Sequence, residues 1–188
     1  MIEKRYFCQP KVIPMLSKQF LKVDHEELTD NFFKALQKEW MLITSGKSDS
    51  FNTMTASWGT IGVLWNRPVA ICFVRPQRYT FEFIEKSDYY TLSFFDDAHK
   101  EILNYCGTHS GRAVDKISKT GLIPVETPSG SIGFEQSRLI IECRKIYSDF
   151  IKPDHILVKK IIDQNYPEKD FHKFFIGEIA GCFKKQVD

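Results

Sequence analysis

The sequence lacks the short motifs that mark many nucleotide-binding and hydrolytic enzymes. It contains no G-x-G-x-x-G, no G-x-x-x-x-G-K-[ST], no H-E-x-x-H and no G-x-S-x-G. The first pattern belongs to Rossmann nucleotide sites, and the others belong to P-loop enzymes, zinc proteases and serine hydrolases. None of these four classes is supported, and we expect no metal site.

Cysteine is scarce in the arrangements that would give it a function. The chain has five cysteines and no C-x-x-C pair: Cys8, Cys72, Cys106, Cys143 and Cys182. Because they are scattered and odd in number, they predict neither a zinc knuckle nor a dithiol redox motif. In a reducing compartment we expect most of them to act as small apolar residues.

Long hydrophobic runs and a strong charge of either sign are absent as well. The densest apolar run, PVAICFV at 68–74, is far too short to cross a bilayer. The first twenty residues lack the apolar core of a secretory signal. The net charge of +2 is too small to argue for nucleic acid. We therefore expect a soluble, cytoplasmic protein with no membrane or nucleic-acid partner.

What the chain does contain is ordinary for a globular protein of one domain. Its 188 residues are 43% hydrophobic and 27% charged, so they can bury a core without disulfides or metals. Sixteen phenylalanines indicate an aromatic-rich core or pocket. Residues 1 to about 28 show no clear period, and we interpret them as an N-terminal extension.

Apolar periodicity and turn signals predict about seven strands and three helices. Helices are predicted at 28–40 with Thr29 or Asp30 as cap, from Thr80 onward, and at 96–107 with Asp96 or Asp97 as cap and Gly107 past the end. Strands are predicted at 41–46, 53–65, 68–74, 89–95, 131–150, 154–166 and 173–183. Because most strands follow one another directly, we favour an antiparallel barrel or sandwich with attached helices over a parallel sheet.

Residues 53–58 alternate hydroxyl and apolar side chains. One strand face carries three hydroxyls and the other three apolar groups: Thr53, Thr55 and Ser57 against Met54, Ala56 and Trp58. The apolar face can be buried while the other face presents hydrogen-bond donors. The alternative is a half-exposed strand with solvated threonines, which are good strand formers.

The segment RPQRYT at 75–80 follows a predicted strand. Pro76 ends the strand, and Thr80 is placed to cap the next helix. Arg78 would then stand beside free backbone N–H groups, where a helix start and a planar guanidinium together favour a phosphate. The alternative is a solvated turn with surface arginines.

Two further segments carry candidate functional residues. The loop 106–116 contains two glycines, His109, a serine and two cations, and it could close over a phosphate or a ring edge; the alternative is an ordinary connector. In the segment 171–183, Glu178 with His172 suggests acid–base chemistry. For that segment we favour the alternative, a core strand with a bulge glycine and a paired glutamate.

Five segments in chain order resemble a known family. They are WMLITSG with FNTMTASWGTIGVLW, VRPQRYTFEFI, YYTLSFF, CGTHSGRAVDK and HKFFIGEI. In this order they resemble the flavin reductase-like family, the FMN-binding split barrel, and within it the flavoredoxin-like branch. The likeness covers roughly residues 31–184 and leaves the N-terminal extension outside. Ala113 departs from the pattern, because an acidic residue is expected there.

The resemblance implies a mainly β fold, a six-stranded antiparallel split barrel (Greek key) with flanking helices. It also implies a homodimer that holds FMN near the subunit interface. The implied cofactor-binding residues are Asn52, Thr53, Met54, Thr55, Ala56, Ser57 and Trp58 along the ring, Arg75, Arg78, Tyr79 and Thr80 at the phosphate, Ser93, Phe94 and Phe95 flanking the flavin, and Cys106, Gly107, Ser110, Gly111 and Lys116 closing the site. His172 has an implied catalytic role near the nicotinamide or the ring edge.

The function implied by the resemblance is FMN-dependent redox chemistry. One hypothesis is an oxidoreductase that accepts hydride from NADH or NADPH and passes electrons to a flavin, a redox protein or a small acceptor. A second is an FMN-binding electron carrier without its own nicotinamide site. A third, of another class, is a non-catalytic barrel that stacks single-stranded nucleic acid on Trp58, Trp65 and phenylalanines. The near-neutral charge argues against the third.

Overall fold

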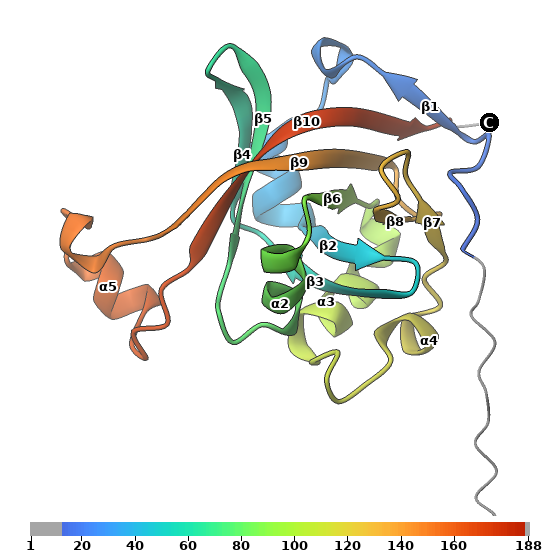
Figure 1. The fold of residues 1–188 in the computed structure, drawn as a ribbon. Helices are drawn as coiled ribbons and strands as arrows, with labels where there is room; N and C mark the ends of the chain where they lie inside the picture. The colour runs from blue at the N-terminus through green and yellow to red at the C-terminus, as the bar shows by residue number, and fades with distance from the viewer. Residues whose placement is uncertain (1–12, 187–188) are drawn as a thin grey trace, which may run out of the picture.

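The computed structural model describes residues 13–186, and the fold is built around one antiparallel sheet (Figure 1). The strands are β1 (Phe20–Val23), β2 (Met41–Lys47), β3 (Ser50–Ala56), β4 (Gly59–Leu64), β5 (Arg67–Val74), β6 (Tyr89–Phe94), β7 (Pro124–Glu126), β8 (Ile132–Phe134), β9 (Leu139–Phe150) and β10 (Lys173–Lys185). The α-helices are α1 (Phe32–Lys34), α2 (Tyr79–Lys86), α3 (Lys100–Thr108), α4 (Lys116–Thr120) and α5 (Lys160–Asn165).

Strand β10 joins the two halves of the sheet. The strand order is β3-β2-β6-β9-β10-β5-β4, and every pairing is antiparallel. The first half of β10 pairs with β5, and its last residues pair with β1. The predicted mainly β, antiparallel fold is confirmed. Within residues 13–186 the main sheet has eight strands, and one of them, β1, lies in the segment that we interpreted as an extension.

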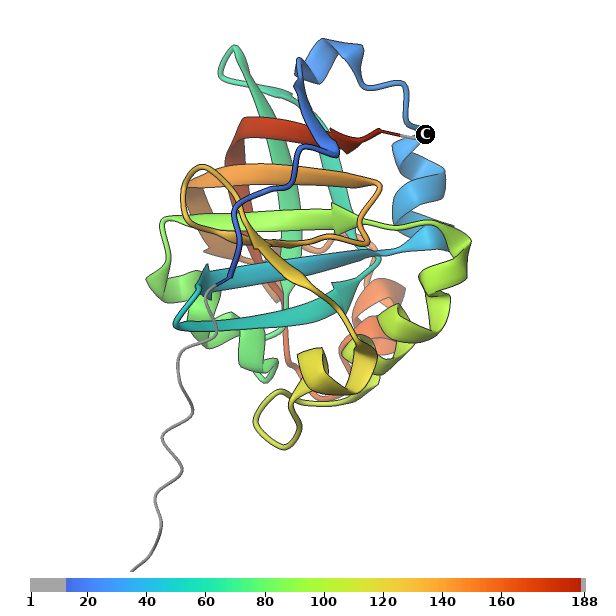
Figure 2. The same ribbon diagram turned by 90° about the vertical axis from the view of Figure 1, so that its right-hand side faces the viewer.

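The N-terminal segment that the structure describes is hydrogen-bonded to β7, which pairs with β8 outside the main sheet, before β1 begins. Backbone hydrogen bonds join Leu16 to the carbonyl of Glu126 (2.9 Å) and Glu126 to the carbonyl of Pro14 (2.8 Å). Figure 2 shows this dark blue segment crossing beside β7. Residues 1–12 of the predicted extension, Cys8 among them, lie outside the described residues. No helix within residues 13–186 has the length and apolar character needed to span a bilayer.

The main core lies inside the curved sheet and requires a glycine at its centre. It contains Met41, Ile43, Leu92, Ile141 and Phe175, among others, all buried. A Cβ atom at Gly177 would lie 2.5 Å from the hydroxyl oxygen of Tyr90 and 2.6 Å from the Cβ of Cys143. Because real side chains do not approach so closely, β10 can pass over this point only as glycine. The register of β10 against β9 shifts here, between Ile176 and Gly177.

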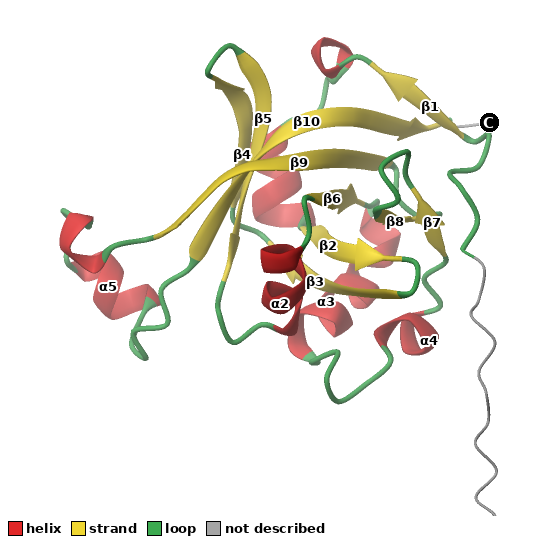
Figure 3. Cartoon of the chain, viewed as in Figure 1, coloured by secondary structure: helices red, strands yellow, loops and turns green. Residues whose placement is uncertain are grey.

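A second apolar cluster attaches α3 to the outer face of the sheet. Leu42 of β2, Phe95, and Leu103 and Cys106 of α3 are all buried together. Figure 3 shows α2, α3 and α4 gathered about β2 and β3. Helix α5 lies apart, on the segment 151–172 between β9 and β10, which we call the arm. This packing carries the loop after α3 alongside β3, where the candidate site forms.

The helix predicted at 28–40 exists but has an unexpected form. Asn31, rather than Thr29 or Asp30, caps α1, since its side chain accepts from the backbone N–H of Lys34 (3.1 Å). A π-helical segment, Ala35–Glu39, continues the helix. Asp30 is instead engaged by a cation on another element, and this long-range ion pair could not be read from local spacing.

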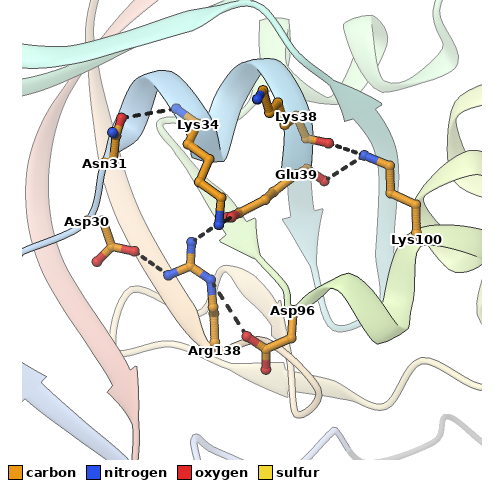
Figure 4. A network of polar contacts seen from close by, with 8 residues as sticks. All are labelled: Asp30, Asn31, Lys34, Lys38, Glu39, Asp96, Lys100 and Arg138. Carbon is orange, nitrogen blue, oxygen red and sulfur yellow. Dashed lines mark hydrogen bonds and ion pairs between the residues drawn. The ribbon is translucent and has the colours of Figure 1, made fainter.

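That cation is Arg138, which begins a polar network drawn in Figure 4. Its guanidinium pairs with Asp30 and with Glu39 (3.0 Å). The ammonium of Lys100 donates to the carbonyls of Lys38 and Glu39, at the end of the π-helical segment. Helix ends leave carbonyls unpaired, and a lysine is well suited to satisfy them. The network therefore fastens this helix to the start of β9 and to α3.

Three other predictions about local structure are wrong. The strand predicted at 53–65 is interrupted at Ser57 and Trp58, which separate β3 from β4. Gly107 lies inside α3 rather than past its end. A glycine fits there because the helix approaches β3 closely: a Cβ at Gly107 would lie 3.3 Å from the Cβ of Thr55. The segment predicted as a strand at 154–166 forms α5 and a short turn of 3₁₀ helix. Its alternating apolar residues face no sheet, and Leu157 is 92% exposed.

Candidate functional site

Two adjoining hollows form one groove along the end of β3, the start of α2 and the loop after α3. The first hollow, about 300 Å³, is lined by Met54, Thr55, Ala56, Ser57, Trp58, Phe73, Arg75, Arg78 and His172. The second, about 230 Å³, is lined by Asn52, Met54, Gln77, Arg78, Tyr79, Thr80, Thr108, His109, Ser110, Gly111 and Lys116. Because both hollows share Met54 and Arg78, we treat them as one groove with a ring end at Trp58 and a cationic end at Lys116.

Arg78 lies at the centre of the groove with hydrogen-bonding capacity left over. It occupies the N-cap position of α2 in extended conformation, so its side chain leaves the helix axis toward α3. Its Nη1 donates to the carbonyl of Gly107 (2.7 Å). Its Nη2 is buried and has no partner in the described part of the chain. An unpaired buried donor on a cation is costly, so this geometry fits an anion in the groove.

Lys116 supplies a second buried cation to the same end. Its side chain leaves the first residue of α4, a helix capped by Asp115, whose carboxylate accepts from the backbone of Ser118 (3.1 Å). The ammonium donates to the carbonyls of Thr53 (2.8 Å) and Cys106 (2.9 Å). An ammonium has three donors, so one remains. Burial lowers the pKa of Lys116 to about 8, and the positive charge of Arg78 acts in the same direction.

Close packing fixes the loop after α3 against β3 and α2. The Nδ2 of Asn52 donates to the hydroxyl of Thr80 (2.7 Å). A Cβ at Gly111 would overlap the side-chain oxygen of Asn52 and lie 3.2 Å from the ring of Tyr79. Thr80 is therefore a buried acceptor for Asn52, and the prediction that it caps α2 is wrong. Only glycine lets the loop approach this closely.

The hydroxyls of Thr53 and Thr55 in β3 are neither solvated nor free in the groove. Those of Thr53 and Thr44 lie 2.9 Å apart across the sheet. The hydroxyl of Thr55 donates to the carbonyl of Leu103 in α3. The face that was expected to present donors is thus covered by a helix, and its hydroxyls stabilise the fold. The opposite face behaves as expected at Met54, which is buried in the main core.

The ring end of the groove is aromatic, and its histidine is uncharged. The rings of Trp58 and His172 lie 4.8 Å apart between centroids, and Phe73 contacts His172 edge-on at 6.5 Å. The Nδ1 of His172 lies 3.0 Å from the hydroxyl of Tyr166. Burial, aided by the charge of Arg75, lowers the pKa of His172 from 6.5 to about 4. His172 is therefore neutral near neutral pH.

Arg75 lines the groove, but its guanidinium is already engaged. It pairs with Asp170 and donates to the carbonyl of Asn165 (2.9 Å), both on the arm between β9 and β10. Gln77 donates to the same carboxylate. Arg78, rather than Arg75, is thus the arginine with donors to spare.

The structure brings most of the predicted site residues together. Those that line the groove are Asn52, Met54, Thr55, Ala56, Ser57, Trp58, Arg75, Arg78, Tyr79, Thr80, Ser110, Gly111, Lys116 and His172. Thr53, Cys106 and Gly107 contribute through their carbonyls, which accept from the two buried cations.

Three predicted flavin-flanking residues lie in the interior instead. Phe94 packs edge-on against Phe32 at 6.0 Å, and Phe95 packs in the cluster beneath α3. The hydroxyl of Ser93, in β6, is buried without a partner in the described residues. None of the three borders the groove.

The sequence interpretation missed two aromatic residues of the ring end. Phe73 could have been predicted, because it lies two residues before Arg75, and side chains two residues apart on an extended strand point to the same face. Tyr166 had no usable signal, since it belongs to a segment whose alternation predicted a strand. Glu178 behaves as the favoured interpretation required: it pairs with Arg67 (2.5 Å) and Arg144 (2.6 Å).

Comparison with known proteins places these features in a family. Residues 33–184 match the family model described as flavin reductase like domain. No curated protein sequence is significantly similar to this chain.

Several solved structures share the fold. A flavoredoxin of Desulfovibrio vulgaris (Miyazaki F) has a TM-score of 0.59 and 23% identity, covering 79% of this chain and 69% of that one. An FMN-binding protein from Thermus thermophilus with bound p-hydroxybenzaldehyde has a TM-score of 0.61 and 19% identity over 77% and 70%. An NADH:FAD oxidoreductase of Streptomyces globisporus has 0.60 and 16% over 78% and 75%. The predicted split-barrel fold is confirmed by these likenesses.

Proposed function

Because this chain belongs to the flavin reductase-like domain family, we propose that it is an FMN-binding oxidoreductase that takes electrons from NADH or NADPH. The acceptor is a flavin, a redox protein or a small molecule. Family membership supports a flavin-linked redox function. The observation that carries the proposal further is the buried, unpaired Nη2 of Arg78 at the centre of a groove that is cationic at one end and aromatic at the other.

The residues of the groove fit FMN. A phosphate at the cationic end would pair with the free Nη2 of Arg78 and with the third donor of Lys116, beside the first turn of α2. The flat apolar ring would lie along residues 54–58, where the chain passes from β3 to β4 and leaves the ladder. When bound, FMN supplies the hydride and electron transfer that no side chain here can perform.

The protein's own groups then bind and orient. Arg78 and Lys116 hold the phosphate in place and carry no proton of the reaction. Trp58 forms an apolar wall against which the flat ring would pack. Neutral His172, beside Trp58, provides a ring nitrogen for a hydrogen bond to the nicotinamide or to another substrate. Support for a nicotinamide donor comes from the similar fold of the Streptomyces NADH:FAD oxidoreductase.

The absorption spectrum of the purified, dialysed protein tests the cofactor. Flavin bands, or their appearance after FMN is added and unbound FMN removed, are the expected result. No bands and no uptake of FMN would overturn the proposal. NADH or NADPH is then added without air: bleaching supports a nicotinamide-linked enzyme. Persistent bands in fully loaded protein would favour the second candidate, an FMN-binding electron carrier reduced by another protein.

We also propose that the protein is a cytoplasmic homodimer. Support comes from exposed apolar residues on β4, on the turn after it and on β9: Val63, Trp65 and Tyr147 are all exposed, and the rings of Trp65 and Tyr147 lie 6.3 Å apart. A contiguous apolar patch of this kind is typical of an interface. Light scattering after size exclusion should give twice the chain mass, and a double change, Val63→Ser with Trp65→Ser, should give the chain mass. Monomeric wild-type protein would refute the dimer.

A further inference from the structure

The arm between β9 and β10 places one buried tyrosine against the ring end of the groove. Tyr166 directly follows α5 and is 3% exposed, although the helix before it is largely exposed. Its ring stacks on Phe171 at 4.6 Å, and the guanidinium of Arg75 lies over it at 5.5 Å. Its hydroxyl lies 3.0 Å from the Nδ1 of His172. The arm therefore folds back to deliver a single polar atom to the histidine.

The direction of this hydrogen bond follows from counting donors and acceptors. The hydroxyl of Tyr166 has no other partner in the part of the chain that the structure describes. If Nδ1 carried the hydrogen, the buried phenolic hydrogen would lack an acceptor, and an unpaired buried donor is unfavourable. If Tyr166 donates to Nδ1, nothing is left unpaired at this contact. The hydrogen of neutral His172 then resides on Nε2.

The surrounding charges keep both rings neutral. Arg75 and Asp170 are the charged groups that act on His172, and they are paired with each other. No carboxylate bonds to His172 among residues 13–186, so no partner stabilises an imidazolium. Trp58 and Phe73, from the two other segments packed against it, carry no charge. Burial raises the pKa of Tyr166 and lowers that of His172 to about 4.

The other ring nitrogen is available to a ligand. His172 lines the ring end of the groove together with Trp58 and Arg78. Its Nε2 has no hydrogen-bond partner in the described residues, and it is not among the fully buried unpaired atoms. A donor without a protein partner thus borders the cavity in which the proposed function places the redox substrate.

We propose that Tyr166 is a positioning residue that holds His172 as the Nε2–H tautomer, so that the groove offers one neutral donor to a carbonyl or carboxamide oxygen. The choice of a redox substrate as the owner of that oxygen rests on the proposed function. The tautomer itself does not, since it follows from contacts within the chain. Tyr166→Phe keeps the ring packing and removes only the hydroxyl.

The test is long-range ¹H–¹⁵N NMR of the full-length protein labelled at histidine and freed of flavin, with His172→Gln to assign the signals. We expect a single Nε2–H tautomer in the wild type. In Tyr166→Phe an Nδ1–H population should appear. Tyr89→Phe, which removes a hydroxyl outside the groove, should leave the spectrum unchanged. An Nδ1–H tautomer in the wild type overturns the proposal even if the variant fails to fold, and so does an unchanged tautomer in a folded Tyr166→Phe protein.

The predicted ligand class is tested on the same sample. Benzamide, which carries a carboxamide oxygen, should shift the Nε2–H signal of His172, whereas benzene, which has no acceptor atom, should not. No shift, or equal shifts with both probes, overturns the assignment of a carbonyl-type ligand. Because the sample contains no flavin, a protein that never binds FMN would refute the proposed function and leave the tautomer result standing.

Discussion

The two ends of the groove hold their polar groups in opposite ways. At the cationic end, the half-buried Arg78 and the buried Lys116 are charges with donors that the described part of the chain leaves unused. At the ring end, His172 and Tyr166 are neutral and bonded to each other. Buried charge without a counter-ion destabilises a fold, whereas a paired neutral contact does not. The cationic end therefore needs the negative charge of a ligand, whereas the ring end already has its Tyr166–His172 hydrogen bond and leaves only the neutral Nε2 donor of His172 for a ligand.

The ends also differ in how they are assembled. The cationic end combines β3, the start of α2 and the loop from α3 to α4, and each piece is fixed by tight contacts such as Asn52 with Thr80 (2.7 Å). The ring end depends on the arm, which is tied to the body through Arg75, Asp170 and the carbonyl of Asn165. We infer that affinity for FMN is set mainly at the cationic end and substrate contact mainly at the ring end.

Among the variants that test this difference between the two ends, Arg78→Ala is expected to have the largest effect, a weaker binding of FMN. Loss of a charge-assisted contact should weaken FMN binding by about 1.5–3 kcal/mol, roughly ten- to a hundred-fold in Kd. The fold should survive, because Nη2 has no partner in residues 13–186 and Nη1 has only one. Titration of FMN by fluorescence quenching measures the Kd. Arg67→Ala is the control: this exposed arginine pairs with Glu178, and neither residue lines the groove. A Kd equal to that of the wild type would remove Arg78 from the phosphate site.

A smaller effect, on stability as well as binding, is expected from Gly111→Ala. The added Cβ would overlap the side-chain oxygen of Asn52 and disturb its bond to Thr80. Overpacking of this kind costs about 1–3 kcal/mol. Gly62→Ala is the matched control, since nothing lies within 4 Å of a Cβ there. Urea unfolding compares the stabilities of the two variants. Equal midpoints would show that the loop accommodates the added Cβ at little cost in stability.

The sequence could identify the cationic end because its signals are local. Arg78 follows a strand-ending proline and precedes a helix, and Gly111 and Lys116 fall in one glycine-rich loop. These short-range patterns predicted the right residues even where the details were wrong, as with Thr80. The antiparallel sheet was predictable for the same reason, since most strands follow one another directly.

The ring end could not be predicted to the same extent, because its contacts span the chain. Arg75 and Asp170 are 95 residues apart. Tyr166 was hidden in a segment whose alternation is typical of a strand, yet which forms the exposed α5. The hydroxyl of Thr55 looked available to a ligand until α3 covered it. Each miss arose where tertiary contacts decide what a polar side chain binds.

Lowering the pH should reduce the free energy of unfolding through His172 at the ring end. The folded-state pKa of His172 is about 4, below its ordinary 6.5, so the unfolded chain takes up the proton first as pH falls. The stabilisation is complete above 6.5 and is lost as pH falls from 6.5 toward about 4. The loss should be on the order of 2 kcal/mol. Urea unfolding across this range should give a shallower pH dependence for His172→Gln than for the wild type. Identical slopes would mean that His172 is not held neutral by burial.

The smallest expected effect is a weakening of FMN binding at the cationic end as the pH is raised. Burial places the pKa of Lys116 at about 8, so the free protein loses this charge as pH rises through that value. A bound phosphate would favour the charged form, and FMN affinity should therefore fall by about 1 kcal/mol as pH rises above the pKa of the free protein. Lys116→Gln, which keeps an N–H donor but no charge, should bind FMN more weakly below that pH and show a flat profile. If wild type and variant had the same pH profile, Arg78 and the first turn of α2 would hold the phosphate without Lys116. The unused third donor of this buried lysine would then serve some other group.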